Sequence, residues 1–465
     1  MPDWAQLDRA LGEAVGPQYV GSGDCADARF RCDVLQKYVQ DPLFVVRPGS
    51  TLEVATCVRI AAEHGVSVTA VGGQTGTVGG AITRPGGIAL SLERMAAITA
   101  VDTRAMAMTV QAGCILQVAQ EAAEAQGAFL PLDLGSRGSA TIGGSIAANA
   151  GGNRVLRWGM MRDMVTGLEV VLADGTVVSS LTTMLKDNAG FPWKQLMIGT
   201  EGTLGIVTQA VLRLRPRPVT DQTALLAVAN FHDVEHLLRM LEVRLGGRLS
   251  SFELMWGEFY SAMTQAQLAS RSRPLEEGHA FYVLVEMLGG DPTHDAVQFE
   301  EALTDAIEDA LVRDAVVAKS GKEREALWAV REDMSPGLAG YRPFSVYDVS
   351  MRLSDMPAFT TDVRKQLEAV FPDARVLFYG HAGDGNLHAV VNVGPDGPAR
   401  EQEIDTIVYE ATSRVGGSIA AEHGIGQSRA MYLSLCKSKA EIELMRRIKR
   451  ALDPLGVLNP GKVLE

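Results

Sequence analysis

The stretch Gly380-His-Ala-Gly-Asp-Gly-Asn-Leu-His388 joins two apolar segments and contains two histidines. The segments 376–380 and 389–393 are rich in Val, Leu, Phe and Tyr, which predicts two β-strands. The Gly-Asp-Gly in the middle predicts a chain reversal, because glycine tolerates positive φ and Asp-Gly favours hairpin turns. A reversal here would bring the imidazoles of His381 and His388 to the same end of a sheet.

A second short stretch, Glu422-His423-Gly424, adds a carboxylate and a third imidazole. Two histidines and one carboxylate form a three-ligand metal site with open positions, so we predict His381, His388 and Glu422 as metal ligands. His423 is then left to act as a base. The alternative is that these histidines are ordinary surface or core residues. The chain has only eight histidines, and three of them lie in two glycine-rich turns, which favours a functional cluster.

Composition limits the classes of protein to consider. The 465 residues are enough for two or three domains, and 46% hydrophobic with 21% charged residues is ordinary for a globular protein. The net charge of −13 argues against nucleic acid as a partner and against docking on anionic lipid.

Cysteine usage and the N-terminus indicate the compartment. The five cysteines include no Cys-x-x-Cys pair, so neither a disulfide framework nor a zinc ribbon is predicted, and a reducing compartment fits best. The first residues carry acids and no apolar core of a signal peptide, and no stretch is apolar enough to span a membrane. We therefore expect a cytoplasmic protein, with peripheral membrane contact through a partner still possible.

The N-terminal half begins with a strand–helix–strand order. A short strand at 44–48 is followed by Ser50 and Glu53, which match a capping box, and by apolar residues at helical spacing up to Gly65. The strand at 66–71 runs into a glycine-rich loop, residues 72–80. The loop has neither G-x-G-x-x-G nor a Walker lysine, so alone it is a weak signal and its glycines could simply form a turn. Its free backbone N–H groups would nevertheless suit a pyrophosphate.

Two further glycine clusters strengthen the case for a large ligand. Residues 134–152 contain almost only small side chains, which permit either close helix packing or close approach of backbone to a flat ligand. Asn149 within this stretch offers a donor and an acceptor for a ring edge. A third cluster, Gly199-Thr-Glu-Gly-Thr-Leu-Gly205, precedes a strand at Ile206. Three such loops at strand ends predict a dinucleotide bound mostly by main chain.

The prolines in Arg215-Pro-Arg-Pro218 indicate a boundary. Beyond it, strands and helices alternate over the next hundred residues, which predicts a separate α+β layer.

With these motifs in order, the chain resembles the flavin-dependent D-2-hydroxyacid dehydrogenases of the vanillyl-alcohol-oxidase fold. Its closest-looking branch is D-2-hydroxyglutarate dehydrogenase, with D-lactate dehydrogenase and the glycolate oxidase flavin subunit as cousins. The resemblance covers roughly residues 40–465. It rests on matched stretches at 72–76, 131–136, 142–144, 149–152, 195–206, 380–388, 422–426 and 453–462.

The resemblance implies an α+β fold with a two-part FAD-binding domain, an α+β substrate or cap domain, and a C-terminal segment that returns to the flavin. We accordingly expect an N-terminal helical lead-in at 1–37, an FAD-binding domain at 38–217 and a cap domain at 218–410. The C-terminal segment, 411–465, carries Glu422 and His423 and would complete the flavin site.

The resemblance also implies FAD, with its pyrophosphate on the loop 72–76 and its ring near Asn149, Gly152, Ile206 and Asn459. The full set of expected FAD contacts is Gly72, Gly73, Gln74, Thr75, Gly76, Thr77, Gly135, Ser136, Gly143, Ser145, Asn149, Gly152, Glu201, Ile206 and Asn459. We expect non-covalent FAD, because the only histidine of the N-terminal half, His64, lies in a predicted helix.

By the same resemblance, His381, His388 and Glu422 hold a divalent metal, with zinc expected, and His423 is the catalytic base. Arg331 matches an arginine that binds the substrate carboxylate, a task for which a planar bidentate fork is well suited. The reaction implied is oxidation of a D-2-hydroxyacid to the 2-oxoacid by hydride transfer to flavin.

Three positions depart from the 2-hydroxyglutarate branch: Ser335 replaces a threonine, Val346 a lysine and Val390 an asparagine. We count these three, with Arg331, as substrate-binding positions. Loss of two polar groups predicts a substrate with a small or apolar distal end, although Arg342 or Arg352 could restore a cation. The alternative is an enzyme specific for D-2-hydroxyglutarate or D-malate.

Two other classes stay open at this stage. One is a metal-independent oxidase or alkyl transferase of the same fold, and the other is a non-catalytic flavin-binding subunit of an electron-transfer complex. The metal and base residues argue against both. The sequence does not select the electron acceptor among electron-transfer flavoprotein, quinone, cytochrome and oxygen. It also leaves the oligomeric state open, with a homodimer among the possibilities.

Overall fold

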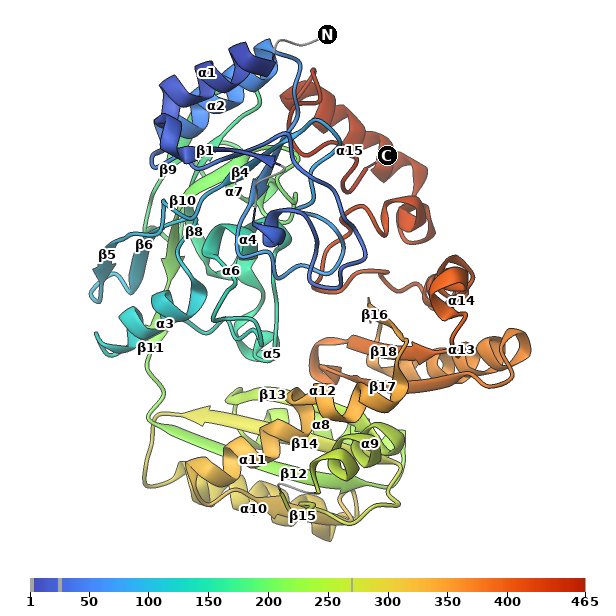
Figure 1. Ribbon diagram of the computed structural model, residues 1–465. Coiled ribbons are helices and arrows are strands. Elements are labelled where there is room, and N and C mark those ends of the chain that lie inside the picture. Colours follow the sequence, from blue (N-terminus) through green and yellow to red (C-terminus); the bar gives the residue numbers. More distant parts are fainter. Residues whose placement is uncertain (1–3, 24–26, 269–270, 465) are drawn as a thin grey trace. The chain divides into compact units, whose positions relative to one another are not determined.

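The computed structural model describes residues 4–23, 27–268 and 271–464 (Figure 1). The chain divides into two compact units. The first comprises Met1–Gly151, Gly159–Arg217 and Glu422–Glu465, and the second comprises Gly152–Trp158 and Pro218–Ala421. The predicted α+β class is confirmed, because both units combine helices with sheets.

A four-stranded sheet in the first unit has the order β1-β2-β4-β3. Its strands are β1 (Val20–Ser22), β2 (Phe44–Val46), β3 (Val68–Val71) and β4 (Ile88–Ser91). Helix α2 (Thr51–Glu63) connects β2 to β3, and Ser50 caps it as predicted, since its side chain accepts a hydrogen bond from the Glu53 N–H. The reciprocal bond of the predicted capping box is replaced, because the Glu53 carboxylate accepts from the Gly49 N–H instead of the Ser50 N–H. Strand β1 lies within the segment expected to be a helical lead-in and pairs antiparallel with β2.

A five-stranded antiparallel sheet of the first unit has the order β5-β6-β10-β8-β9. Helix α4 (Ile142–Ala148) contacts β10 and β6, and its small residues permit this close packing. At Gly143 a Cβ would lie 2.7 Å from the Ala112 Cβ, so only glycine fits there. The strands are β5 (Ile98–Asp102), β6 (Ala107–Gln111), β8 (Val165–Val171), β9 (Val177–Ser180) and β10 (Ile206–Arg213).

The other α-helices and strands described in the first unit include β7 (Ala128–Phe129) and β11 (Arg215–Pro216), which form a two-stranded sheet. The rest are α1 (Trp4–Val15), α3 (Leu116–Glu124), α6 (Met161–Met164), α7 (Trp193–Met197) and α15 (Lys439–Leu452). Among the described residues, no helix combines the length and the apolar character that crossing a membrane requires.

The second unit is built on a seven-stranded antiparallel sheet with the order β15-β12-β14-β13-β17-β18-β16. The strands are β12 (Thr220–Val228), β13 (Leu249–Trp256), β14 (Phe281–Gly289), β15 (Asp314–Val317), β16 (Ser345–Ser350), β17 (Arg375–Gly380) and β18 (Asn386–Asn392). Strand β17, which ends just before the predicted metal ligand His381, therefore pairs with β13, which lies more than a hundred residues earlier in the chain.

Helices cover both faces of this sheet. Helices α9 (Gly257–Gln267), α11 (Gly321–Glu332) and α12 (Met334–Leu338) bury an apolar cluster against one face. Helix α8 (Phe231–Arg244) contacts β12, β13 and β14, and α10 (Asp295–Glu308) contacts α8 and β12. The other helices are α13 (Met356–Val370), α14 (Glu401–Arg414) and α5 (Val155–Trp158), the last of which contacts β13.

The reversal predicted between the two histidines is confirmed. Strands β17 and β18 pair antiparallel, and the turn between them contains a short 3-10 helix, Ala382–Asp384. Gly385 follows with φ +84°, and a Cβ there would lie 2.5 Å from the Met351 carbonyl oxygen. Glycine is therefore required at the position where the chain turns back.

Candidate active site

The two histidines of the turn lie side by side in the second unit. His381 directly follows β17 and His388 lies within β18, and their ring centroids are 5.4 Å apart. Both are buried, with 6% and 5% of their surface exposed. The prediction that the reversal unites the two imidazoles at one end of a sheet is confirmed.

Each histidine has a buried carboxylate near its Nδ1 atom. Glu253 Oε1, from β13, lies 2.7 Å from His381 Nδ1. Asp348 Oδ1, from β16, lies 3.8 Å from His388 Nδ1. The carboxylate at His381 is close enough to keep the proton on Nδ1 and to leave Nε2 with its lone pair, as is common for metal-binding histidines. The Asp348 oxygen is too far from His388 Nδ1 for a hydrogen bond.

Neither carboxylate was selected as a site residue from the sequence. For Glu253 the available signal was a single acid in the apolar run Phe252-Glu-Leu-Met-Trp256, which the structure shows as part of a fully buried strand. Acids are almost never fully buried unless they are paired, so such a position indicates a partner elsewhere in the fold.

Glu422 directly follows Ala421, whose N–H donates a hydrogen bond of 3.2 Å to Asp348 Oδ2. His381, His388 and Glu422 each offer one ligand atom, and these atoms lie within 4.8 Å of one another. Ligands on one Zn²⁺ are about 3–4 Å apart, so small side-chain movements would complete a site. Two imidazoles and a carboxylate are a chemically suitable set for a divalent metal.

Arg331 is the buried cation of this region. It lies near the end of α11, and its Nε donates a hydrogen bond of 3.0 Å to Glu253 Oε2. Its guanidinium carbon lies 4.6 Å from the centroid of the Tyr379 ring, and that ring is 5.0 Å from the His388 ring. Arg331 and the two histidines thus share one face of the sheet.

The three departures from the 2-hydroxyglutarate branch differ in their surroundings. Val346 and Val390 are opposite each other on β16 and β18. Val346 is half-buried, whereas Val390 belongs to the apolar cluster under α9, α11 and α12. Ser335 is exposed on α12.

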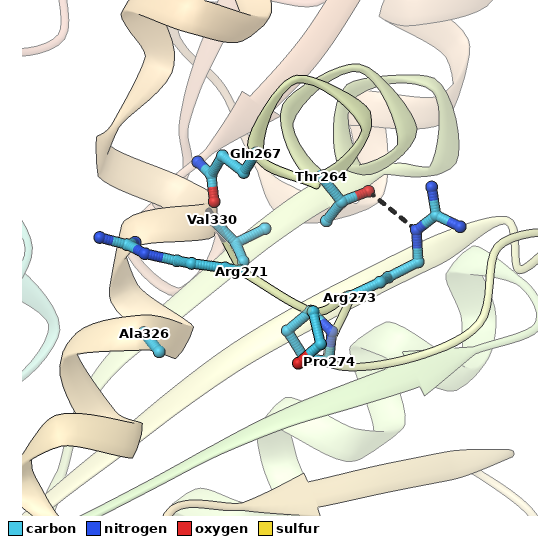
Figure 2. Close-up of a pocket in the computed structure, with 8 residues that line it drawn as sticks. Thr264, Gln267, Arg271, Arg273, Pro274, Ala326 and Val330 are labelled. Carbon is cyan, nitrogen blue, oxygen red and sulfur yellow. Dashed lines mark hydrogen bonds between the residues drawn. The ribbon is translucent and has the colours of Figure 1, made fainter. Parts of the chain in front are cut away.

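A separate pocket lies beside α9 and α11 (Figure 2). Its lining consists of Thr264, Gln267, Arg271, Ser272, Arg273, Pro274, Ala326 and Val330. Arg273 Nε donates a hydrogen bond of 3.2 Å to Thr264 Oγ1 across it. This lining includes no histidine or carboxylate, so it offers neither a base nor a metal ligand.

In the first unit, the loop after β3 presents buried polar atoms that fit a ligand. Both amide atoms of Gln74 are buried without a hydrogen-bond partner among the described residues, and the same is true of Ser145 Oγ. Buried polar groups are normally hydrogen-bonded, so unpaired ones indicate a missing partner. A polar cofactor such as FAD would supply it.

The glycines around this loop serve different purposes. At Gly73 a Cβ would lie 1.9 Å from the Ser139 carbonyl oxygen, and at Gly72 it would lie 2.4 Å from Thr141 Oγ1. These two are required for close packing of the chain on itself. At Gly76 and Gly135 a Cβ would meet nothing within 4 Å, so these positions leave open space.

Two asparagines expected near the flavin ring have side chains that bond within the protein. Asn149 ends α4 with φ +50°, and its Oδ1 accepts a hydrogen bond from the Arg162 N–H. Asn459 accepts from Thr69 Oγ1 and donates to the carbonyl oxygens of Gly80 and Glu201. These side chains shape the region around β3. Ile206 begins β10 and is buried, whereas Gly152 belongs to the segment assigned to the second unit.

Glu201 binds the chain that follows the predicted base. Its two oxygens accept hydrogen bonds from the N–H groups of Ile425 and Gly426, at 2.7 and 2.8 Å. Burial raises the pKa of this carboxyl, while these bonds and the nearby Arg429 and Lys462 oppose that rise. His423 precedes this loop, and its Nε2 lies 3.7 Å from Glu422 Oε1.

Comparison with known proteins decides the family. Residues 42–180 match the family described as FAD binding domain, and residues 217–463 match FAD linked oxidases, C-terminal domain. The chain belongs to the FAD-linked oxidase family. As a member of this family it is an FAD-dependent oxidoreductase, and the expected resemblance is confirmed.

Curated relatives of this FAD-linked oxidase cover nearly the whole chain. It is 38% identical to D-2-hydroxyglutarate dehydrogenase of Xanthomonas citri pv. viticola, over 93% of this chain and 91% of the relative. It is 39% identical to the mitochondrial D-2-hydroxyglutarate dehydrogenase of Bos taurus, over 90% and 76%. It is 34% identical to a putative mitochondrial D-lactate dehydrogenase of Schizosaccharomyces pombe, over 95% and 85%.

Solved structures agree on the vanillyl-alcohol-oxidase fold. p-Cresol methylhydroxylase with substrate bound matches with a TM-score of 0.80 at 15% identity, over 99% of this chain and 97% of that one. Alkyldihydroxyacetonephosphate synthase matches with a TM-score of 0.76 at 18% identity, over 98% and 85%. At such low identity these likenesses establish the fold alone.

Proposed function

We propose that this FAD-linked oxidase oxidises a D-2-hydroxyacid to the corresponding 2-oxoacid, with a divalent metal, zinc in the first place, bound by His381, His388 and Glu422. The observation that carries the proposal is the pair of buried imidazoles, His381 with the Glu253 carboxylate at hydrogen-bonding distance from its Nδ1, and ligand atoms of His381, His388 and Glu422 within 4.8 Å of one another. Buried histidines arranged in this way are characteristic of metal ligands. The relatives named D-2-hydroxyglutarate and D-lactate dehydrogenases share the 2-hydroxyacid as a substrate class.

FAD, when bound, supplies the oxidant that accepts a hydride from the substrate Cα. The buried, unpartnered amide of Gln74 and the hydroxyl of Ser145 would be among the groups that hold it. We propose non-covalent binding, because His64, the only histidine within residues 42–180 of the sequence, directly follows α2 with its Nδ1 at 2.9 Å from the Ile60 carbonyl oxygen. FAD should then appear in the supernatant after acid precipitation of the protein.

A divalent metal, when bound, supplies a Lewis acid that lowers the pKa of the substrate hydroxyl. His423 takes the hydroxyl proton as general base while the C–H bond breaks, and the carbonyl of the 2-oxoacid forms. Arg331 binds the substrate carboxylate. Its bond to Glu253 uses Nε, so both terminal Nη groups remain for a bidentate pair with the substrate.

The distal end of the substrate should be small or apolar. Val346 and Val390 form an apolar cross-strand pair two residues along the same two strands from the pair Asp348 and His388. The two arginines that could compensate are exposed, and Arg352 is already paired with Asp355 at 2.7 Å. The names of the relatives favour a second candidate, a substrate with a second carboxylate such as D-2-hydroxyglutarate or D-malate.

The test is a panel of D- and L-2-hydroxyacids with an artificial dye as acceptor. We expect a higher kcat/KM for D-lactate and larger apolar D-2-hydroxyacids than for D-2-hydroxyglutarate or D-malate. The reverse order would establish the second candidate instead. Anaerobic addition of the best substrate should bleach the flavin. If no 2-hydroxyacid reduces the flavin, the proposed dehydrogenase activity is wrong and the protein is a non-catalytic flavin-binding subunit.

For the physiological acceptor we propose an electron-transfer flavoprotein, a quinone or a cytochrome. The cytoplasmic location and a homodimer stay predictions, and several relatives are named as mitochondrial. Fractionation and light scattering would test these two.

A further inference from the structure

Glu253 has two partners, one on each carboxylate oxygen. Oε1 lies 2.7 Å from His381 Nδ1, and Oε2 accepts a hydrogen bond of 3.0 Å from Arg331 Nε. All three side chains are buried, with the Glu253 side chain only 1% exposed. The three residues come from β13, the end of β17 and α11, so one carboxylate connects three elements of the second unit.

We propose that Glu253 is a positioning residue that sets both the metal-binding nitrogen of His381 and the direction of Arg331. The inference rests on the proposed function and deepens it. One carboxylate would then orient both the metal ligand His381 and the carboxylate-binding Arg331.

The effect on His381 follows from hydrogen-bonding capacity. An ionised carboxylate can only accept, so the Nδ1 that faces it must carry the proton. Nε2 then has the free lone pair that a metal requires. The buried positive charge of Arg331 beside Oε2 compensates the buried negative charge of Glu253.

The effect on Arg331 is one of orientation. The bond at Nε fixes the guanidinium from one side, and the face of the Tyr379 ring, 4.6 Å away, restricts its plane. An arginine held at Nε presents its two Nη groups as a pre-oriented fork. Substrate binding would then lose less side-chain entropy than with a mobile arginine.

Asp348 does not duplicate this role. Its oxygens accept from the Asn386 side chain at 2.8 Å and from the Ala421 N–H at 3.2 Å. Its distance of 3.8 Å from His388 Nδ1 is longer than a hydrogen bond.

The neighbouring strand provides a matched control, Glu286. It lies on β14 and is 1% exposed. Its Oε1 accepts from Arg154 Nε at 3.2 Å and from Ser250 Oγ at 3.0 Å. It is thus a buried glutamate paired with an arginine, and its hydrogen-bond partners among the described residues include no histidine.

The test compares Glu253→Gln with Glu286→Gln in the full chain with FAD bound. Glutamine has one acceptor oxygen. If that oxygen stays on Arg331, the amide N–H₂ faces His381 and favours the tautomer with the proton on Nε2. We expect Glu253→Gln to bind Zn²⁺ or Co²⁺ roughly 10–100-fold more weakly. We also expect a raised KM for the substrate and unchanged FAD content. Glu286→Gln should keep the wild-type metal affinity.

Competition with a chelator gives the metal affinity, and the visible absorption of bound Co²⁺ reports the ligand set. Glu253→Asp, which keeps a carboxylate, should restore part of the metal affinity, and it also serves as the test if the glutamine variant does not fold. Wild-type Co²⁺ affinity, Co²⁺ spectrum and KM in Glu253→Gln would overturn the inference. So would an equal loss of metal in Glu286→Gln. A wild-type chain that binds neither metal would overturn the proposed metal site, and this inference with it, before any variant is made.

Discussion

Glu201 accepts a hydrogen bond of 2.7 Å from the backbone N–H of Ile425, a residue 224 positions later in the chain. Its second oxygen accepts from the N–H of Gly426. The loop that these bonds hold begins directly after Glu422 and His423. A residue that the sequence placed among the FAD contacts therefore binds the segment that carries the proposed base and a proposed metal ligand.

Replacing Glu201 with glutamine should destabilise this loop. The amide N–H₂ would face a backbone N–H, and one buried donor would lose its acceptor, which costs about 1–3 kcal/mol. We expect a lower free energy of unfolding in urea and a lower kcat. Glu124→Gln is the control. Glu124 is exposed, and its ion pair with Arg217 is long at 3.9 Å. Its replacement should therefore change the free energy of unfolding by no more than about 1 kcal/mol. Equal unfolding midpoints for Glu201→Gln and wild type would contradict this role.

Gly424→Ala should be more harmful than Gly456→Ala. Both positions have positive φ, +82° and +66°, which costs an alanine about 1–2 kcal/mol. At Gly424 the new Cβ would in addition lie 2.8 Å from Glu201 Oε1, whereas at Gly456 nothing lies within 4 Å. The difference in melting temperature between the two variants measures the steric part. If the two variants have the same melting temperature, the Glu201 carboxylate does not pack tightly on the loop.

Removing the proposed base should slow the chemistry without releasing the cofactor. We expect His423→Asn to lower kcat by roughly 10²–10⁴. The flavin absorbance per chain should stay at the wild-type value. His294→Asn, at an exposed position on the second unit, is the control and should leave kcat unchanged. Wild-type turnover in His423→Asn would exclude this residue as the base.

Metal removal should separate the two proposed cofactors. A chelator is expected to abolish activity while the flavin spectrum persists, because the metal donors lie apart in sequence from the FAD-binding stretch at 42–180. Zinc should restore the activity. His388→Ala should lose the metal permanently. Full activity in protein shown by elemental analysis to be metal-free would contradict the metal requirement.

Stability should rise with pH because of Lys462. Burial, with the nearby Arg84, lowers the pKa of this lysine to about 8. In the unfolded chain the pKa returns to about 10.4, so between about pH 8 and 10 the unfolded state binds more protons than the folded state. The free energy of unfolding therefore increases with pH through this window. Lys462→Met should remove that increase, which urea unfolding at several pH values would show. If the free energy of unfolding of the wild type does not rise with pH relative to that of the variant, the pKa of Lys462 is not lowered.

Local sequence signals predicted the parts of the site that depend on neighbouring residues. The Gly-Asp-Gly turn between two apolar strands led to the hairpin that unites His381 and His388. Ser50 was recognised as a helix cap, and it forms that bond. These features are readable because the residues that determine a turn or a cap lie within a few positions of one another.

The role of the glycines in these loops could be predicted only in part from the sequence. The sequence indicated backbone close to a ligand, but at Gly72 and Gly73 the close neighbour is the chain itself, at Thr141 and Ser139. A missing side chain looks the same in the sequence whether a cofactor or another segment fills the space. Only the packed structure distinguishes the two, by showing what a Cβ would strike.

The sequence alone determined which residue types are available: three imidazoles in two turns, a carboxylate beside one of them and an arginine at a helix end. The tertiary structure decided how they are connected. Glu253 is separated by 128 positions from His381 and by 78 from Arg331. It meets His381 because β13 pairs with β17, and it meets Arg331 because helix α11 packs on the same sheet. Strand order depends on the burial of whole faces of the sheet, so partners so distant along the chain are fixed only when the core packs.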